Sequence, residues 1–230
     1  LEINGEPFHF RGFGKHEDFH IIGKGLNLPL LVRDFDLLRW VGANSVRTTH
    51  YPYSEEFLDL ADEVGLAVIA EAPAVGQCLG FGEKAEVTFC EGKVDGRALA
   101  RHLDVMERMI ARDRHHPCIV VWSVGNEPNT QDPDARPYFE EVFARTRALD
   151  SSRPVMLVEH QPPGLSHTAQ LSDIIGVNRY MGWYSEPGQL ALAGERLRAD
   201  LVEWHRRFGK PVFVTEYGAD ALAGLHALPA

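Results

Sequence analysis

Two glutamates stand directly after apolar runs of strand length: Glu127 in the segment WSVGNEP and Glu216 in VTEYGAD. A pair of carboxyl groups that flanks a glycosidic bond can hydrolyse it, because one protonates the leaving oxygen while the other attacks the sugar or activates a water. A separation of about 5 Å gives retention of the anomeric configuration, and about 6.5–9.5 Å gives inversion. This chemistry requires a fold that brings two distant parts of the chain together.

Polar side chains also follow the other apolar runs of the chain. They are His16 with Glu17 and Asp18, Arg47 with His50, Glu71, Asn126, Glu159 with His160, and Asn178 with Tyr180. In a barrel of parallel strands, the loops that follow the strands form one common mouth, where active sites are built. These residues are therefore expected to surround the two glutamates.

The elements that position these residues alternate between two hydrophobic patterns. Strands are predicted at Phe8–Phe13, Asn44–Thr48, Leu66–Glu71, Cys118–Gly125, Pro154–Glu159, Asp173–Asn178 and Pro211–Glu216. Several of these runs are apolar without alternation, which is typical of parallel strands buried on both faces. Amphipathic helices are predicted at Leu30–Val41, from Ser54 onward, and around Leu99–Ile110, Phe139–Leu149 and Leu197–Phe208. Trp40 and Trp204 fall on apolar helix faces and are expected in the core.

Seven strands with six intervening helices leave two α/β folds, a doubly wound dinucleotide-binding sheet and a (β/α)8 TIM barrel. The segment RGFGKHED has two glycines at G-x-G spacing but no third glycine and no following helix, unlike a dinucleotide-binding turn. We therefore predict a TIM barrel that forms a single catalytic domain over residues 1–230. About seven strands are present, and the eighth is expected beyond the C-terminal end of this chain.

Barrel geometry gives an expected distance between the two glutamates. Eight strands about 4.8 Å apart and tilted by about 36° enclose a radius of about 7.5 Å. The fourth and seventh strands are then roughly 14 Å apart, and two inward side chains of about 4–5 Å bring the carboxyls to about 5 Å. The estimate favours a retaining mechanism. Pro128 is expected to hold Glu127 in an extended backbone conformation.

Composition excludes several classes of partner. The 230 residues hold 23 Lys and Arg against 33 Asp and Glu, and a net charge of −10 is the opposite of what phosphate-backbone binding needs. The sequence holds no uninterrupted run of 18 apolar residues, which is the length that a membrane-spanning helix needs. Three cysteines are too few for a disulfide framework, which favours a reducing, cytoplasmic location. The chain begins with Leu1, so it is expected to be a piece of a longer protein.

A metal-dependent hydrolase is the main chemical alternative. His16, His50, Glu127 and Glu216 are residue types that bind zinc or manganese, but the chain has neither H-x-H nor H-E-x-x-H spacing among them. His115 and His116 lie at the end of a predicted helix, on the barrel face that serves stability. We therefore expect neither a metal nor an organic cofactor.

Five segments, RGFGKHED, RTTHYP, WSVGNEP, NRYMGWY and TEYGAD, resemble in order and spacing the catalytic barrel of glycoside hydrolase family 2. The resemblance runs from Leu1 to the last residues. It implies that Glu127 is the acid/base and Glu216 the nucleophile. The similarity is greatest to the members that hydrolyse β-D-glucuronides, and β-galactosides or β-mannosides remain alternative substrates. A catalytically inactive, sugar-binding barrel fragment is the alternative from another functional class.

Further residues are assigned to the substrate site. Asn126 can donate to the sugar 2-hydroxyl, and Tyr180 and Arg47 are expected to keep Glu216 ionised. Trp183 can stack on a sugar ring. The remaining assignments, which rest mainly on the resemblance, are His16, Asp18, His50, Asn178 and Tyr184. The resemblance also implies upstream β-sandwich domains, a homo-oligomeric full-length protein, and an Asn-x-Lys element after the eighth strand that contacts the sugar carboxylate.

Overall fold

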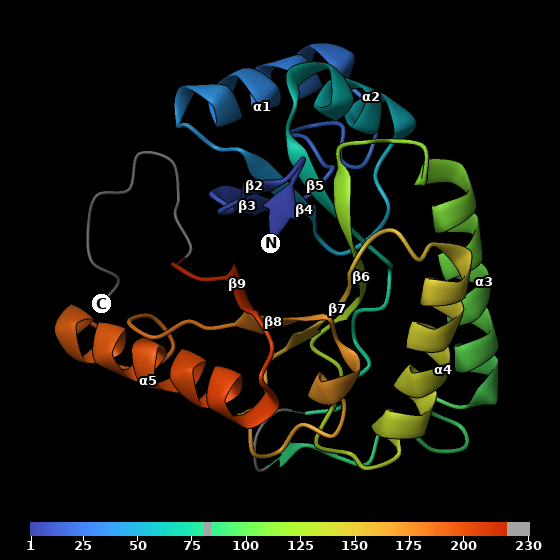
Figure 1. The fold of residues 1–230 in the computed structure, drawn as a ribbon, viewed down its shortest axis with the longest axis vertical. Helices are drawn as coiled ribbons and strands as arrows, with labels where there is room; N and C mark the ends of the chain where they lie inside the picture. The colour runs from blue at the N-terminus through green and yellow to red at the C-terminus, as the bar shows by residue number, and fades with distance from the viewer. Residues whose placement is uncertain (81–83, 220–230) are drawn as a thin grey trace.

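The computed structural model describes residues 1–80 and 84–219, and its centre is a curved sheet of seven parallel strands. The strands follow one another in space in the order of the chain (Figure 1). They are β3 (Gly12–Lys15), β4 (Ser45–Thr48), β5 (Ala67–Glu71), β6 (Ile119–Asn126), β7 (Val155–Glu159), β8 (Ile174–Asn178) and β9 (Val212–Glu216). This sheet is a nearly closed TIM barrel, as the sequence predicts.

Helices cover the outer side of the sheet (Figure 1). They are α1 (Leu28–Trp40), α2 (Glu55–Val64), α3 (Gly96–Asp113), α4 (Ala135–Leu149) and α5 (Leu190–Phe208). The sequence predicts six helices between the strands, but the connection from β7 to β8 contains only the short 3-10 helix Ala169–Leu171 in the described residues. The segment Pro162-Pro163-Gly164 explains the difference, because proline and glycine both disfavour a helix interior.

The first predicted strand is the one whose position is wrong. Instead of Phe8–Phe13, the strand begins at Gly12, and a hairpin of β1 (Glu2–Ile3) and β2 (Glu6–Pro7) precedes it. Asn4 and Gly5 turn this hairpin with φ of 54° and 79°, as an Asn-Gly turn requires. Phe10 packs on Phe213 with ring centroids 4.7 Å apart and joins the apolar cluster inside the barrel. Phe10 therefore packs its ring into the barrel interior and is not part of a strand of the sheet.

Two apolar layers hold the barrel together. Inside the sheet, Ile69, Val121, Met156, Val158 and Ile174 form one cluster. A larger cluster lies between the sheet and the helices and includes parts of α1 to α4. Because the strands are buried by both layers, their sequences read as unbroken apolar runs.

The helices are set by local signals that the sequence contains. Ser54 caps α2 by accepting a hydrogen bond from the backbone N–H of Phe57, and Gly65 ends the helix in the left-handed conformation. Trp204 on α5 is fully buried as expected, whereas Trp40 is 82% exposed. None of the described helices has the length and apolar character needed to span a membrane.

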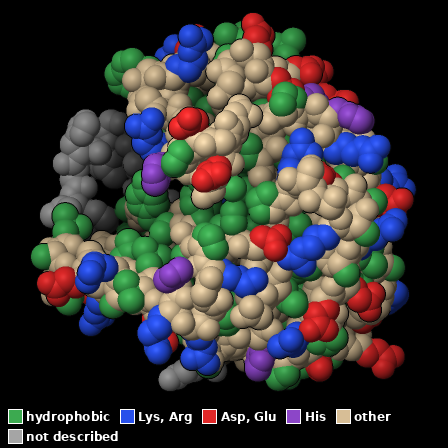
Figure 2. Space-filling view, in the orientation of Figure 1, with side chains coloured by type: hydrophobic (Ala, Val, Ile, Leu, Met, Phe, Trp, Pro, Cys, Tyr) green, Lys and Arg blue, Asp and Glu red, His purple; other side chains and the backbone are tan. Residues whose placement is uncertain are grey.

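The two outer strands of the sheet, β3 and β9, lack a strand on their free sides in the described residues. Phe13 on β3 is 54% exposed, and beside it Leu37 of α1 and Val41, the residue that follows α1, are 43% and 53% exposed. These residues line a hollow beside β3. Figure 2 shows hydrophobic side chains on the surface between the regions of α1 and α5. An open barrel edge with apolar neighbours is a surface that pairs readily with other chains.

We expect a polypeptide of residues 1–230 alone to self-associate, because the edges of β3 and β9 that lack a partner strand among the described residues can pair between molecules. Sedimentation velocity over a range of concentrations checks this. Phe13→Lys, which places a charge on the β3 edge, should shift the population toward monomer. Ile21→Lys is the control, since Ile21 is 91% exposed in the turn between Phe19 and Gly23, outside the strands of the sheet. A monomeric wild-type polypeptide at all concentrations would contradict the prediction.

Candidate active site

Arg47, at the end of β4, is the centre of the polar groups at the mouth of the barrel. Its guanidinium donates from Nε to Glu71 Oε2 at 2.7 Å and from Nη1 to Glu216 Oε1 at 2.9 Å. Nη2 donates to Asn126 Oδ1 at 2.7 Å and to Glu71 Oε1 at 3.1 Å. One buried side chain thus connects the ends of β4, β5, β6 and β9.

Glu71 is the counter-ion that holds Arg47 in place. Its carboxylate is fully buried and also accepts hydrogen bonds from Ser123 Oγ and His50 Nδ1, each at 2.8 Å. Burial alone would raise the pKa of Glu71, but the charge and hydrogen bonds of Arg47, together with His50, lower it below the ordinary value. Glu71 therefore stays ionised. The sequence places it at a strand end but does not assign it to the site.

Glu216 lies at the end of β9 with its side chain 20% exposed. Arg47 and the Tyr180 hydroxyl donate to its two different oxygens, and His50 Nε2 is 3.9 Å from Oε1. Burial and the neighbouring Glu216 raise the pKa of Tyr180, so its hydroxyl remains a donor. These are the two donors that the sequence predicts for this carboxylate.

Glu127 follows β6 with a backbone that differs from the expectation. Its φ is +49°, in the left-handed region, whereas Pro128 predicts an extended conformation. A hydrogen bond from its backbone N–H to the carbonyl of Val158 at 2.9 Å holds this strained turn on β7. The turn carries the carboxyl to Asn178, whose Nδ2 donates to Oε1 at 2.7 Å.

The environment of Glu127 suits an acid. Burial raises the pKa of its carboxyl, and the negative charge of Glu216 raises it further, while the hydrogen bond from Asn178 and the charge of Arg47 act in the opposite direction. The net effect is a raised pKa. A carboxylic acid that keeps its proton closer to neutral pH is what general-acid catalysis needs.

Asn126 and Asn178 connect Arg47 to Glu127 through hydrogen bonds. Asn126 Oδ1 accepts from both Arg47 Nη2 and Asn178 Nδ2, the latter at 3.2 Å. Since its oxygen is occupied, the Nδ2 of Asn126 is the end that remains to donate to a substrate. Asn178 donates from its Nδ2 to Asn126 and Glu127, and its contact with the sugar stays a prediction.

The loop that follows β3 brings further predicted residues to the mouth. The His16 and His50 rings are 5.7 Å apart, and burial and the charge of His50 lower the pKa of His16. Glu17 accepts from the backbone N–H of Ser54 at 3.0 Å, which ties the loop carrying His16 and the exposed Asp18 to the start of α2.

An aromatic group stands next to Glu216. Trp183 and Tyr184 stack with ring centroids 4.2 Å apart, and Tyr180 lies 5.4 Å and 5.0 Å from these two rings. Tyr184 is 73% exposed, so its ring is free to contact a bound molecule. The three rings offer an apolar surface of the kind that packs against a sugar.

The residues that the metal alternative requires do not come together in a metal-binding group within residues 1–80 and 84–219. The group there with three possible ligand atoms within 4.8 Å of one another is Asp62, His116 and Cys118. It lies before β6, away from the strand ends that carry the glutamates. Asp62 already accepts hydrogen bonds from His116 Nδ1 and the Cys118 backbone N–H, both at 2.7 Å.

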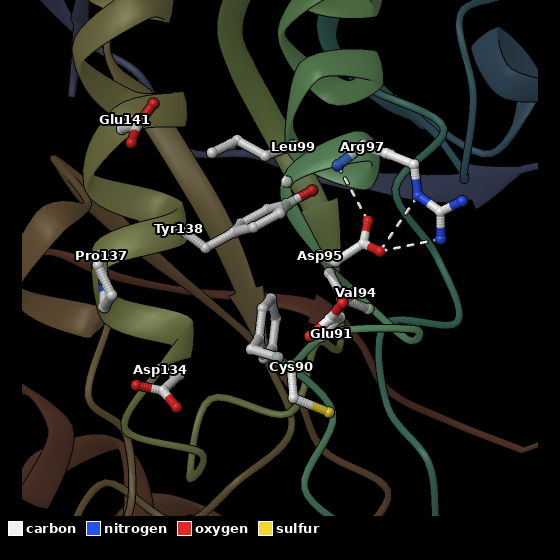
Figure 3. A pocket seen from close by; sticks show the side chains of 12 residues that line it. Cys90, Glu91, Val94, Asp95, Arg97, Leu99, Asp134, Pro137, Tyr138 and Glu141 are labelled. Carbon is white, nitrogen blue, oxygen red and sulfur yellow. Dashed lines mark hydrogen bonds and ion pairs between the residues drawn. The ribbon is translucent and has the colours of Figure 1, made fainter.

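A second hollow, of about 600 Å³, lies where the first turns of α3 and α4 meet the segment before α3 (Figure 3). Phe89, Val94, Leu99, Pro137 and Tyr138 give it an apolar lining, and Asp95 at its rim pairs with Arg97. None of the residues predicted for the catalytic site lines it.

Comparison with known proteins identifies the family. The model of the glycosyl hydrolases family 2 TIM barrel domain matches residues 1–230. This chain belongs to glycoside hydrolase family 2. A beta-glucuronidase of Paenibacillus borealis is 48% identical over 227 residues, which are 99% of this chain and 38% of the relative. The beta-glucuronidase of Mus musculus is 44% identical over 229 residues, or 99% of this chain and 33% of the relative.

Solved structures agree with this assignment. The beta-D-glucuronidase of Dictyoglomus thermophilum matches with a TM-score of 0.93 at 48% identity, over 97% of this chain and 38% of its own. A Ruminococcus gnavus beta-glucuronidase in complex with uronic isofagomine matches with a TM-score of 0.91 at 39% identity, over 99% and 40% of the two chains. The resemblance seen in the sequence is therefore confirmed, and the chain spans between 33% and 40% of the length of these relatives.

We expect Arg47→Lys to lower kcat by about 10²–10³-fold, because one ammonium nitrogen with three donors cannot replace the four hydrogen bonds that three guanidinium nitrogens make to Glu71, Glu216 and Asn126. Lysine keeps the positive charge but leaves some of these buried acceptors without a donor, which costs about 1–3 kcal/mol of stability, so the free energy of unfolding should fall. Steady-state kinetics and denaturant unfolding of the full-length protein measure both effects. Arg136→Lys is the control, since Arg136 pairs with Glu140 on the surface of α4. Unchanged kcat in Arg47→Lys would show that catalysis does not need the several hydrogen bonds of the Arg47 guanidinium.

Proposed function

We propose that the full-length protein that contains this chain is a retaining β-glucuronidase, in which Glu127 is the acid/base and Glu216 the nucleophile. The observation that carries the proposal is the contrast between the two carboxyl groups. Glu216 receives donors on both oxygens, whereas burial and a neighbouring negative charge favour the protonated form of Glu127. The names of the relatives support a glucuronide as substrate.

In the first step, a Glu216 oxygen attacks the anomeric carbon while Glu127 transfers its proton to the glycosidic oxygen. The bond from the anomeric carbon to that oxygen breaks, and a covalent glycosyl-enzyme forms. Arg47 and Tyr180 hold the attacking carboxylate in position, so it does not have to be oriented at the moment of reaction.

In the second step, Glu127 acts as a base. It is now ionised and takes a proton from a water molecule, which attacks the anomeric carbon and releases Glu216. The donor of Asn178 stabilises the ionised form of Glu127 that this step requires. Both steps need only the two carboxyls, the substrate and water.

The remaining groups at the mouth fit the roles of substrate contacts. The free Nδ2 of Asn126 is suited to donate to the sugar 2-hydroxyl, a hydrogen bond that strengthens in the transition state. We assign the rings of Trp183 and Tyr184 to a face of the substrate, and His16, Asp18 and His50 to its hydroxyl groups. The β-galactoside and β-mannoside alternatives gain no support from the names of these relatives.

Glu127→Ala tests the assignment of the acid. We expect this variant to form the glycosyl-enzyme from a nitrophenyl glucuronide at close to the wild-type rate, because nitrophenolate leaves without a proton. With an alkyl glucuronide, whose leaving group must be protonated, the rate should fall by about 10²–10⁴-fold. Pre-steady-state kinetics on both substrates measure this step. Equal losses on the two substrates would contradict acid catalysis by Glu127, and Glu140→Ala on the surface of α4 is the control.

A further inference from the structure

Thr215 directly precedes Glu216 on β9, but its side chain serves the other glutamate. It is 8% exposed, and its Oγ1 donates to Asn178 Oδ1 at 2.7 Å. Asn178, on the neighbouring strand β8, is 5% exposed and donates from the other end of its amide to Glu127 Oε1. A continuous path of hydrogen bonds therefore runs from Thr215 to Glu127.

The orientation of the Asn178 amide follows from its neighbours. A guanidinium can only donate, so the contact with Arg47 Nη2 fixes Asn126 with its oxygen toward Arg47. That same oxygen faces Asn178, as does Glu127 Oε1. Two acceptors on one side require the Nδ2 end of Asn178 there. Its oxygen must then point to the other side, where Thr215 supplies the donor.

We propose that Thr215 is a positioning residue for the acid/base, because its hydroxyl locks the Asn178 amide in the orientation that donates to Glu127. The inference rests on the proposed function of Glu127. In this proposal β9 carries the nucleophile Glu216 and, through Thr215, also orients the hydrogen-bond partner of Glu127. The strand would thus set the geometry of both steps.

Loss of the Thr215 hydroxyl should change the chemistry and not only the packing. Without that donor, Asn178 Oδ1 is a buried acceptor that lacks its partner, so the orientation that donates to Glu127 becomes less favourable relative to the one that turns the amide oxygen toward Glu127. An oxygen in that position favours the protonated carboxyl and opposes the carboxylate. Glu127 should then hold its proton to higher pH and act more slowly as the base.

Other charged and titratable groups face Glu127, and the substitution of Thr215 alters the chemistry of none of them. They are Glu216 on β9, Arg47 and His50 at and after β4, Tyr180 after β8, and Cys78 after β5. A shift in the pH profile is therefore attributable to the hydrogen bond from Asn178.

Thr215→Val in the full-length protein keeps the shape of the side chain and removes its hydroxyl. The basic limb of kcat/KM for an alkyl glucuronide should move upward by about one pH unit, which corresponds to about 1.4 kcal/mol. Deglycosylation, measured as the recovery of activity after trapping with a 2-fluoro glucuronide, should slow by about tenfold. Thr215→Ser, which retains the hydroxyl, should match wild type in both measurements.

Each outcome decides the proposal. A uniform loss of rate in Thr215→Val with the basic limb unmoved shows a packing role only and overturns the inference. Glu127→Gln separates this from failure of the proposed function: a basic limb that persists in Glu127→Gln overturns the assignment of Glu127 and the inference with it. If Thr215→Val does not fold, Thr215→Ala removes the same donor without adding bulk, and the same shift is expected.

Discussion

The structure of this site depends on one buried guanidinium. Arg47 is 3% exposed, and three groups that can only accept from it surround it: the carboxylates of Glu71 and Glu216 and the amide oxygen of Asn126. A buried charge is tolerated only when it is paired and hydrogen-bonded, so these partners have little freedom to move. These partners lie at the ends of β5, β6 and β9. Hydrogen bonds to one cation therefore fix the relative positions of side chains from most of the barrel mouth.

That constraint also separates the two glutamates chemically. Glu216 shares the cation directly, whereas Glu127 reaches it only through Asn178 and Asn126. The indirect path leaves burial and the charge of Glu216 to raise the pKa of Glu127. Glu71, the third carboxylate, is fully occupied by Arg47, Ser123 and His50. Similar carboxyl groups thus receive different roles from their neighbours, as in other enzymes with paired acids.

The sequence predicts the strands after the first one well, because a strand buried on both faces leaves an unbroken apolar run that no other element shares. It fails where tertiary packing decides. Phe10 fills the barrel interior instead of the sheet, and Trp40 lies two residues from the buried Leu38 and so on the opposite side of α1. The left-handed turn at Glu127 is set by β7, and the roles of Glu71 and Thr215 arise from hydrogen bonds between different strands. No local pattern contains such information.

The residue that carries a trapped sugar identifies the nucleophile directly. The full-length protein is incubated with 2-deoxy-2-fluoro-β-D-glucuronyl fluoride, and the labelled peptide is identified by mass spectrometry. The fluorine at C2 slows hydrolysis of the covalent intermediate, so the adduct survives digestion. We expect one fluoroglucuronyl group on Glu216, the carboxylate that Arg47 and Tyr180 both orient. An adduct on Glu127 or Glu71, or turnover of natural glucuronides with no covalent adduct and with inverted product, would contradict this expectation.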